Sequence, residues 1–290
     1  MPLQAFLLVL LAAFAHSTWN LLIKHAAGSK HLLLLSSLTE VVLFFPLGIY
    51  GVARSWPVIG WKAVLFLLAT GVLHLLYTEC LLRGYRAADL SVVYPLARGI
   101  GPLLSFFGAV LILQEHISVL SAAGALLITF GILLSSGGLY APRHRLHQAG
   151  LLWGFAAGFT IACYTLVDGY SVTALFLSPF LVEYASNAVR ALLLSIGALR
   201  EHASPVEEYV AEYRAYWRHL CAIAVLMPVG YILVLFAMRM APISHVAPVR
   251  EMSMIIGAWF GIKLLGEGQA KHRMYGSALI AAGVAAMAAG

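Results

Sequence analysis

The sequence predicts an all-α membrane protein with ten transmembrane helices, arranged as two inverted five-helix repeats. Three observations support this fold class. Of the 290 residues, 62% are hydrophobic and only 10% are charged, which is far from the composition of soluble domains. Apolar runs of about 20 residues, enough for a helix to cross a bilayer, recur along the whole chain. The stretch 90–137 also returns, altered, at 243–290.

The internal repeat is the strongest of these observations, because a repeat fixes the organisation of a chain before any other feature. Each copy has an apolar helix with an early proline, a turn marked by glutamate, and a second apolar helix punctuated by glycine. We interpret the chain as a duplicated membrane protein and the two glutamates as caps of the helices that follow them. The matched positions are Pro95 and Pro248, Gly108 and Gly261, Glu115 and Glu267, Gly124 and Gly276, and Gly131 and Gly283.

Length and hydrophobicity predict ten spans. A basic stretch separates five from five, so we expect a first unit at 1–138, a connecting loop at 139–149 and a second unit at 150–290. An odd number of spans per unit gives the two units opposite orientations in the bilayer. Residues 201–216 also predict a short interfacial helix with Ser204 as its N-cap. The predicted spans are 3–24, 32–53, 62–84, 89–113, 119–137, 150–172, 179–200, 217–238, 244–265 and 272–289.

Several function classes are disfavoured by the sequence. The net charge is +6, but no basic patch interleaved with aromatic residues occurs, so nucleic acid is not an expected partner. The three cysteines lie inside predicted spans and show neither disulfide nor metal spacing. The sequence contains no HExxH, GxSxG or P-loop motif, so we expect no metal, no cofactor and no enzymatic activity. An intramembrane enzyme and a structural or regulatory subunit are the alternatives, and a subunit would be inert when purified alone.

Three short stretches resemble the EamA family of the drug/metabolite transporter superfamily. They are HSTWNLLIK at 16–24, VVYPLARG at 92–99 and LQE at 113–115, with echoes of the last two in the second half. The resemblance implies ten helices in two inverted halves around a central cavity. It also implies cytoplasmic termini and transport of amino acids, other small metabolites or drugs, often outward.

The distribution of positive charge argues for the opposite orientation. Twelve of the lysines and arginines lie in odd-numbered connections and only three in even-numbered ones. Because positive residues prefer the cytoplasmic side, this count places both termini outside. The two arguments leave the sidedness open.

Polar and charged residues inside the spans form the candidate site. A charge in the bilayer costs about 2.5–3.5 kcal/mol by insertion scales, so it usually faces a cavity or a partner. Each half carries an arginine deep in a span, and a guanidinium fork suits a carboxylate or phosphate. The substrate-binding candidates are Arg98, Arg250, Tyr94, His16, Asn20, Glu79, Tyr231 and His245, and the proton-coupling candidates are Glu79, Glu251 and His16.

A structural role is the alternative for these residues. They would then form ion pairs between helices, and removing either partner would destabilise the fold. Lys24 and Asp168 lie near predicted helix ends, and we interpret both as side chains that extend toward the membrane interface.

These observations predict a secondary transporter, an exporter by resemblance, for a small polar, amphoteric or anionic metabolite such as an amino-acid-like compound. It would work by alternating access, with proton coupling as a further hypothesis. Hydrophobic cationic drugs are the alternative substrate class. The expected partners are the solute and membrane lipid, and the expected location is a bacterial inner membrane. The chain is expected to be a monomer or a homodimer, because its glycine-rich faces can pack helices within one chain or between two.

Overall fold

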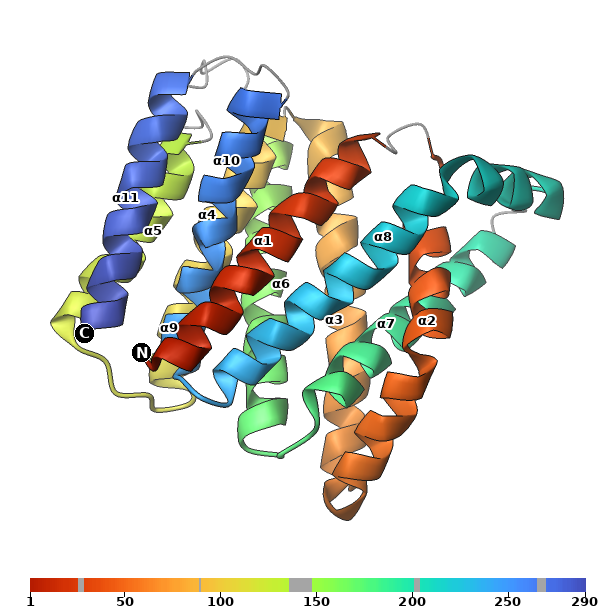
Figure 1. Cartoon of the computed structure of the whole chain (residues 1–290), viewed down its shortest axis with the longest axis horizontal. Coiled ribbons are helices and arrows are strands. Elements are labelled where there is room, and N and C mark those ends of the chain that lie inside the picture. The colour runs from red at the N-terminus through yellow and green to blue at the C-terminus, as the bar shows by residue number, and fades with distance from the viewer. Residues whose placement is uncertain (26–28, 89, 136–147, 201–203, 265–269) are drawn as a thin grey trace.

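The computed structural model describes residues 1–25, 29–88, 90–135, 148–200, 204–264 and 270–290. In this part of the chain every regular element is a helix (Figure 1). The predicted connecting loop 139–149 falls almost entirely outside the described residues. The helices are α1 (Leu3–His25), α2 (Leu32–Ser55), η1 (Trp56–Val58), α3 (Trp61–Ala87), α4 (Leu90–Leu111), α5 (Val119–Ser135), α6 (Gln148–Thr173), α7 (Pro179–Arg200), α8 (Val206–Met238), α9 (Ile243–Val249), η4 (Arg250–Met252), α10 (Ser253–Leu264) and α11 (Ala270–Ala289).

Six of these helices are long and apolar enough to cross a membrane: α1, α2, α3, α4, α6 and α8. The other predicted spans are also helical, but each differs from a simple apolar span. The apolar parts of α5 and α11 are shorter, and α7 buries Glu183, Asn187 and Arg190. The ninth span is divided into α9, η4 and α10. The all-helical class is confirmed, and the ten-span arrangement stays a prediction.

The predicted interfacial helix is not a separate element. α8 runs through 33 residues, so it combines that helix with the predicted eighth span, and its N-cap is Pro205. Its first turns are held beside the start of α2, where Lys30 pairs with Glu208 at 3.0 Å and His31 with Glu212 at 2.7 Å. These contacts favour continuing the helix over a bend at the membrane interface.

Helices from the two halves of the chain alternate within one bundle (Figure 1). α5 and α11 lie side by side at one edge, and α2 packs against α7 at the other. Between these edges the packing pairs come in matching sets, because α3 packs on α6 as α8 packs on α1, and α4 packs on α6 as α10 packs on α1. Both termini lie at one end of the bundle, where the Met1 ammonium donates a hydrogen bond to the Ala288 carbonyl at 3.4 Å.

Glycines set the close approach of α5 and α11. A Cβ atom on Gly131 would lie 2.8 Å from the Gly276 carbonyl oxygen, and one on Gly124 would lie 2.7 Å from the Gly283 carbonyl oxygen. Both distances are far shorter than ordinary van der Waals contact. The glycine-rich faces therefore pack helices within one chain.

Adding a methyl group to this contact should destabilise the fold. We expect Gly131→Ala to lower the free energy of unfolding by about 1–3 kcal/mol, the usual cost of overpacking. Thermal unfolding of the purified protein in detergent measures the change. Gly197→Ala in α7 is the matched control, because a Cβ atom there meets no described atom within 4 Å. Equal melting temperatures for the two variants would contradict the tight contact.

Candidate functional site

A cavity of about 610 Å³ lies among α1, α2, α3, α4, α7, α8 and α10, with the last residue of α5 at its wall. The C-terminal halves of α1 and α3 and the N-terminal halves of α2 and α4 supply much of its wall, so it lies in the half of the bundle away from the termini. Its wall is mostly apolar and aromatic. The polar and aromatic lining residues include His16, Trp19, Asn20, Tyr77, Thr78, Tyr85, Tyr94, Arg98, Arg190 and Ser253.

An arginine–carboxylate cluster lies beside this cavity, where the ninth span is broken. Pro248 lacks a backbone N–H and ends regular α-helix geometry within a turn, and η4 then places Arg250 and Glu251 in the interior. The Glu251 carboxylate lies 3.0 Å from Arg98 Nη2 and 3.8 Å from Arg250 Nε. All three side chains are buried. Two guanidinium groups therefore share one carboxylate.

The Arg98 guanidinium is held from three directions. Besides pairing with Glu251, its Nη2 donates to His16 Nε2 and to Ser253 Oγ, each at 3.2 Å. Ser17 of α1 donates to the Ser253 carbonyl at 2.7 Å and so holds the broken span against α1. In contrast to its second copy, α4 stays helical through its internal prolines. Only one of the two repeated helices is broken, although both carry the early proline.

A second polar cluster has Asp168 at its centre. This side chain is 0% exposed, so the interpretation of Asp168 as a helix-end side chain extending to the interface was wrong. Its Oδ2 atom accepts hydrogen bonds from the Tyr231 hydroxyl at 2.5 Å and from His74 Nε2 at 3.2 Å. The His74 ring stacks on Tyr164 with the centroids 4.0 Å apart. The side chain of Lys24, the other residue of that interpretation, is outside the described part of the chain.

A third polar cluster lies between α2 and α7. Arg190 pairs with Glu40 at 3.6 Å and donates to Asn187 Oδ1 at 2.6 Å. Asn187 in turn donates to the Ser37 carbonyl at 3.0 Å. The carboxyl group of Glu183 lies beside that of Glu40. One arginine thus compensates two neighbouring carboxyl groups.

The structure brings many of the predicted site residues together. His16, Asn20, Tyr94 and Arg98 line the cavity. Arg250 and Glu251 lie in the arginine cluster, and Tyr231 lies in the Asp168 cluster. Sequence reasoning gave no role to His74 as a partner of Asp168. The four-residue spacing of Thr160, Tyr164 and Asp168, which places them on one face of α6, was the available signal.

Two predicted site residues lie elsewhere. Glu79 is not among the described residues that line the cavity; its side chain is 46% exposed and pairs with Arg83 at 2.6 Å. One residue along a helix rotates a side chain by about 100°, so Glu79 points away where Thr78 points in. His245 is buried against α5, where it hydrogen-bonds with Ser121 Oγ at 3.0 Å, and it too is absent from the described lining.

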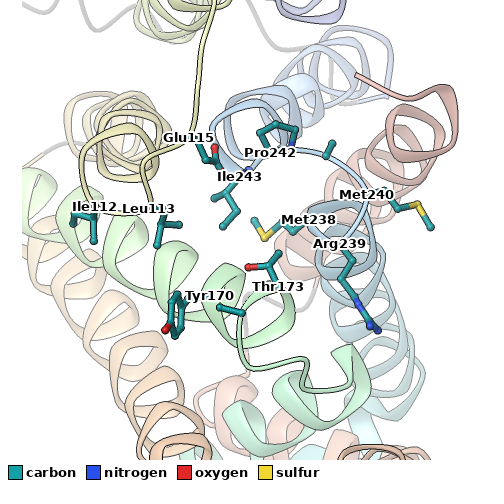
Figure 2. Close-up of a pocket in the computed structure, with 12 residues that line it drawn as sticks. Ile112, Leu113, Glu115, Tyr170, Thr173, Met238, Arg239, Met240, Pro242 and Ile243 are labelled. Atoms are coloured by element: carbon teal, nitrogen blue, oxygen red, sulfur yellow. Dashed lines mark hydrogen bonds between the residues drawn. The ribbon is translucent and has the colours of Figure 1, made fainter. Parts of the chain in front are cut away.

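A second hollow, of about 540 Å³, lies at the opposite end of the bundle (Figure 2). It is formed where α4 and α6 end and where α8 connects to α9. Glu115 lies at its rim and accepts backbone hydrogen bonds from Ile243 at 2.8 Å and Ser244 at 2.9 Å. Glu115 therefore caps α9 in the other half of the chain, and not the helix that follows it as the sequence suggested. Glu267 lies outside the described residues.

Apolar helices long enough to cross a bilayer, packed around a cavity with buried charged groups, define an integral membrane protein. Residues 3–137 match the model of the EamA-like transporter family. That family belongs to the drug/metabolite transporter superfamily, and the match suggests a membrane transporter.

Solved structures extend the likeness to the whole chain. One crystal structure of a protein aligns over 99% of this chain and 96% of its own, with a TM-score of 0.73 and 17% sequence identity. At this identity the match shows a shared fold. The comparison with curated proteins finds no match.

Proposed function

We propose that the chain is a secondary active transporter that exports a small amphoteric or anionic metabolite, such as an amino-acid-like compound, across a bacterial inner membrane. The observation that carries this proposal is the cluster of Arg98, Arg250 and Glu251 beside the central cavity. Two guanidinium groups and one carboxylate carry a net positive charge when all are ionised. That charge favours a carboxylate or phosphonate group on the solute.

The rest of the cavity suits the organic part of such a solute. Trp19, Tyr77, Tyr85 and Tyr94 supply aromatic surface. A hydrophobic cation would find the same surface, but it would also meet the excess positive charge of the arginine cluster. The charge therefore favours an anionic or amphoteric solute over a cationic drug.

Alternating access in this proposal uses ten spans in two inverted units, 1–138 and 150–290. The internal sequence repeat supports it, and so do the matching packing pairs of α3 with α6 and α8 with α1. In many secondary transporters the solute site lies where two such repeats meet, and it is formed by broken helices. The break at η4 beside Arg98 is of this kind.

Ligand-dependent stability tests the proposal. A ligand that binds the native state at 100 times its Kd stabilises it by about 2.7 kcal/mol. We expect amino acids or phosphonates, screened against polyamines and hydrophobic cations, to raise the melting temperature of the purified protein. In Arg98→Gln this shift should disappear, while Glu251 keeps Arg250 as a partner and the protein stays folded.

Arg83→Gln is the matched control, because Arg83 also pairs with a glutamate but is half exposed and outside the described cavity lining. It should keep the full shift. Stabilisation by hydrophobic cations alone, or an equal loss of the shift in both variants, would refute the assignment of Arg98 to an anionic solute.

A further inference from the structure

We propose that His74 and Asp168 form the proton-binding site that drives transport; the inference rests on the proposed transport function and adds its energy source. The pair joins α3 to α6, and Tyr231 joins both to α8. It differs from the proton-coupling candidates that the sequence indicated. Of those, Glu79 is partly exposed, while Glu251 and His16 are both engaged by Arg98.

The contacts of Asp168 are unequal. Oδ2 accepts both hydrogen bonds, from Tyr231 and His74, whereas Oδ1 accepts none from the described residues and is fully buried. A buried acceptor without a partner costs free energy, so the described contacts leave the Asp168 carboxylate only partly compensated.

The charge balance of the interior distinguishes Asp168 from the carboxylates that pair with arginine. Glu251 pairs with two arginines, and Glu40 pairs with Arg190. The ion pair described for Asp168 is with His74, whose charge depends on a proton. An isolated buried carboxylate is strongly disfavoured. Protonation of His74 therefore balances the charge of the Asp168 carboxylate. When His74 releases the proton, that charge is again uncompensated.

The groups around the pair are fixed by packing. Tyr164 stacks on the His74 ring, and Thr78 donates to the His74 carbonyl at 3.0 Å. Titratable and charged groups face the pair from each neighbouring helix: Tyr164 from α6, Tyr231 from α8, Arg190 and Glu183 from α7, Arg250 from η4, and, beside Tyr164, Arg98 from α4.

The position of the pair suits a proton that enters on one side and leaves on the other. His74 lies one helical turn from Thr78, which lines the central cavity. Asp168 lies just over one turn from Thr173, which lines the second hollow at the other end of the bundle. In the proposed step the imidazole gains an N–H bond while Asp168 stays ionised, and that proton is released in the opposite-facing state. One proton moves per cycle, and no oxidant or reductant takes part.

The proton site is tested directly, without a solute. Protein labelled with 15N-histidine in lipid nanodiscs is titrated between about pH 5 and pH 9, the range in which histidines change charge. Among the histidine signals, we expect one whose chemical shift changes over this pH range and that is absent from the spectrum of His74→Gln. The same signal should lie at a different chemical shift in Asp168→Asn. Tyr231→Phe gives a second route if Asp168→Asn does not fold, because it removes only one hydrogen bond to Asp168. A His74 signal that keeps one protonation state over this range would overturn the inference.

Coupling is tested in proteoliposomes with the radiolabelled amino acid or phosphonate that gives Arg98-dependent stabilisation. His74→Gln should keep solute exchange at equal pH on both sides but lose accumulation driven by a pH gradient. His219→Gln, at a histidine outside the described lining of both hollows, should keep both. Retained gradient-driven accumulation in His74→Gln would refute the coupling role alone. Absence of any Arg98-dependent solute would refute the proposed function, and the 15N titration would still decide the proton site.

Discussion

Replacing Glu251 with glutamine should cost about 3–5 kcal/mol of stability, the range found when one partner of a buried ion pair is removed. The substitution keeps the shape of the side chain but leaves Arg98 and Arg250 buried without their shared carboxylate, 3.0 and 3.8 Å away. Two uncompensated guanidinium groups would then lie in the protein interior. Chemical or thermal unfolding in detergent measures the loss.

Two further variants show whether the cost comes from unpaired charge. Glu79→Gln removes the partner of Arg83 in a half-exposed pair, and it should cost no more than about 1 kcal/mol. The double variant Arg98→Gln with Glu251→Gln should lose less stability than the sum of the losses in its two single variants. In the double variant the Arg98 charge is itself removed, so it is no longer buried without a partner. If Glu251→Gln is as stable as Glu79→Gln, the arginine cluster does not depend on its carboxylate.

Filling the central cavity should strongly reduce transport while leaving the fold intact. Gly257 lines the cavity, and a Cβ atom there meets no described atom within 4 Å. Gly257→Trp therefore has room for its first side-chain atom and places an indole ring in the space proposed for the solute. We expect solute binding to weaken by about tenfold or more, which equals ~1.4 kcal/mol or more, and transport into proteoliposomes to fall at least in proportion.

Gly197→Trp is the matched control for this variant. Gly197 lies in α7, is equally open at the Cβ position, and is outside the described cavity lining. It introduces the same side chain into the same kind of helix and should leave transport near the unmodified level. Equal loss of transport in both variants would show that the tryptophan acts through folding or insertion and not by occupying the cavity.

Much of the fold was predictable from local properties of the sequence. Apolar length placed a helix at every predicted span, since the cost of exposing backbone groups in lipid forces helices there. Helical periodicity also placed His16 and Asn20 on one face of α1, and both line the cavity. The interfacial helix was wrongly separated from the eighth span. Only contacts with distant residues, such as that of His31 with Glu212, show that the two continue as one helix.

The pairings inside the site could not be predicted in the same way. Periodicity tells which residues share a face of one helix, but not which face of another helix meets it. Asp168 lies near the end of its apolar run and looks like an interface residue by position. It is buried because α3 and α8 bring His74 and Tyr231 to it. Glu79 shows the reverse error, because a position beside cavity residues was taken as a position in the cavity.

The close contact between α5 and α11 has a consequence for biogenesis. Gly131 and its neighbour Gly276 belong to the last helix of each half, so the contact joins segments made far apart in time. α5 is synthesised well before α11, so the contact between their glycine faces can form only after both helices have been made. Variants at these glycines are expected to accumulate as inserted but unsealed protein, sensitive to membrane proteases, even where each helix inserts normally.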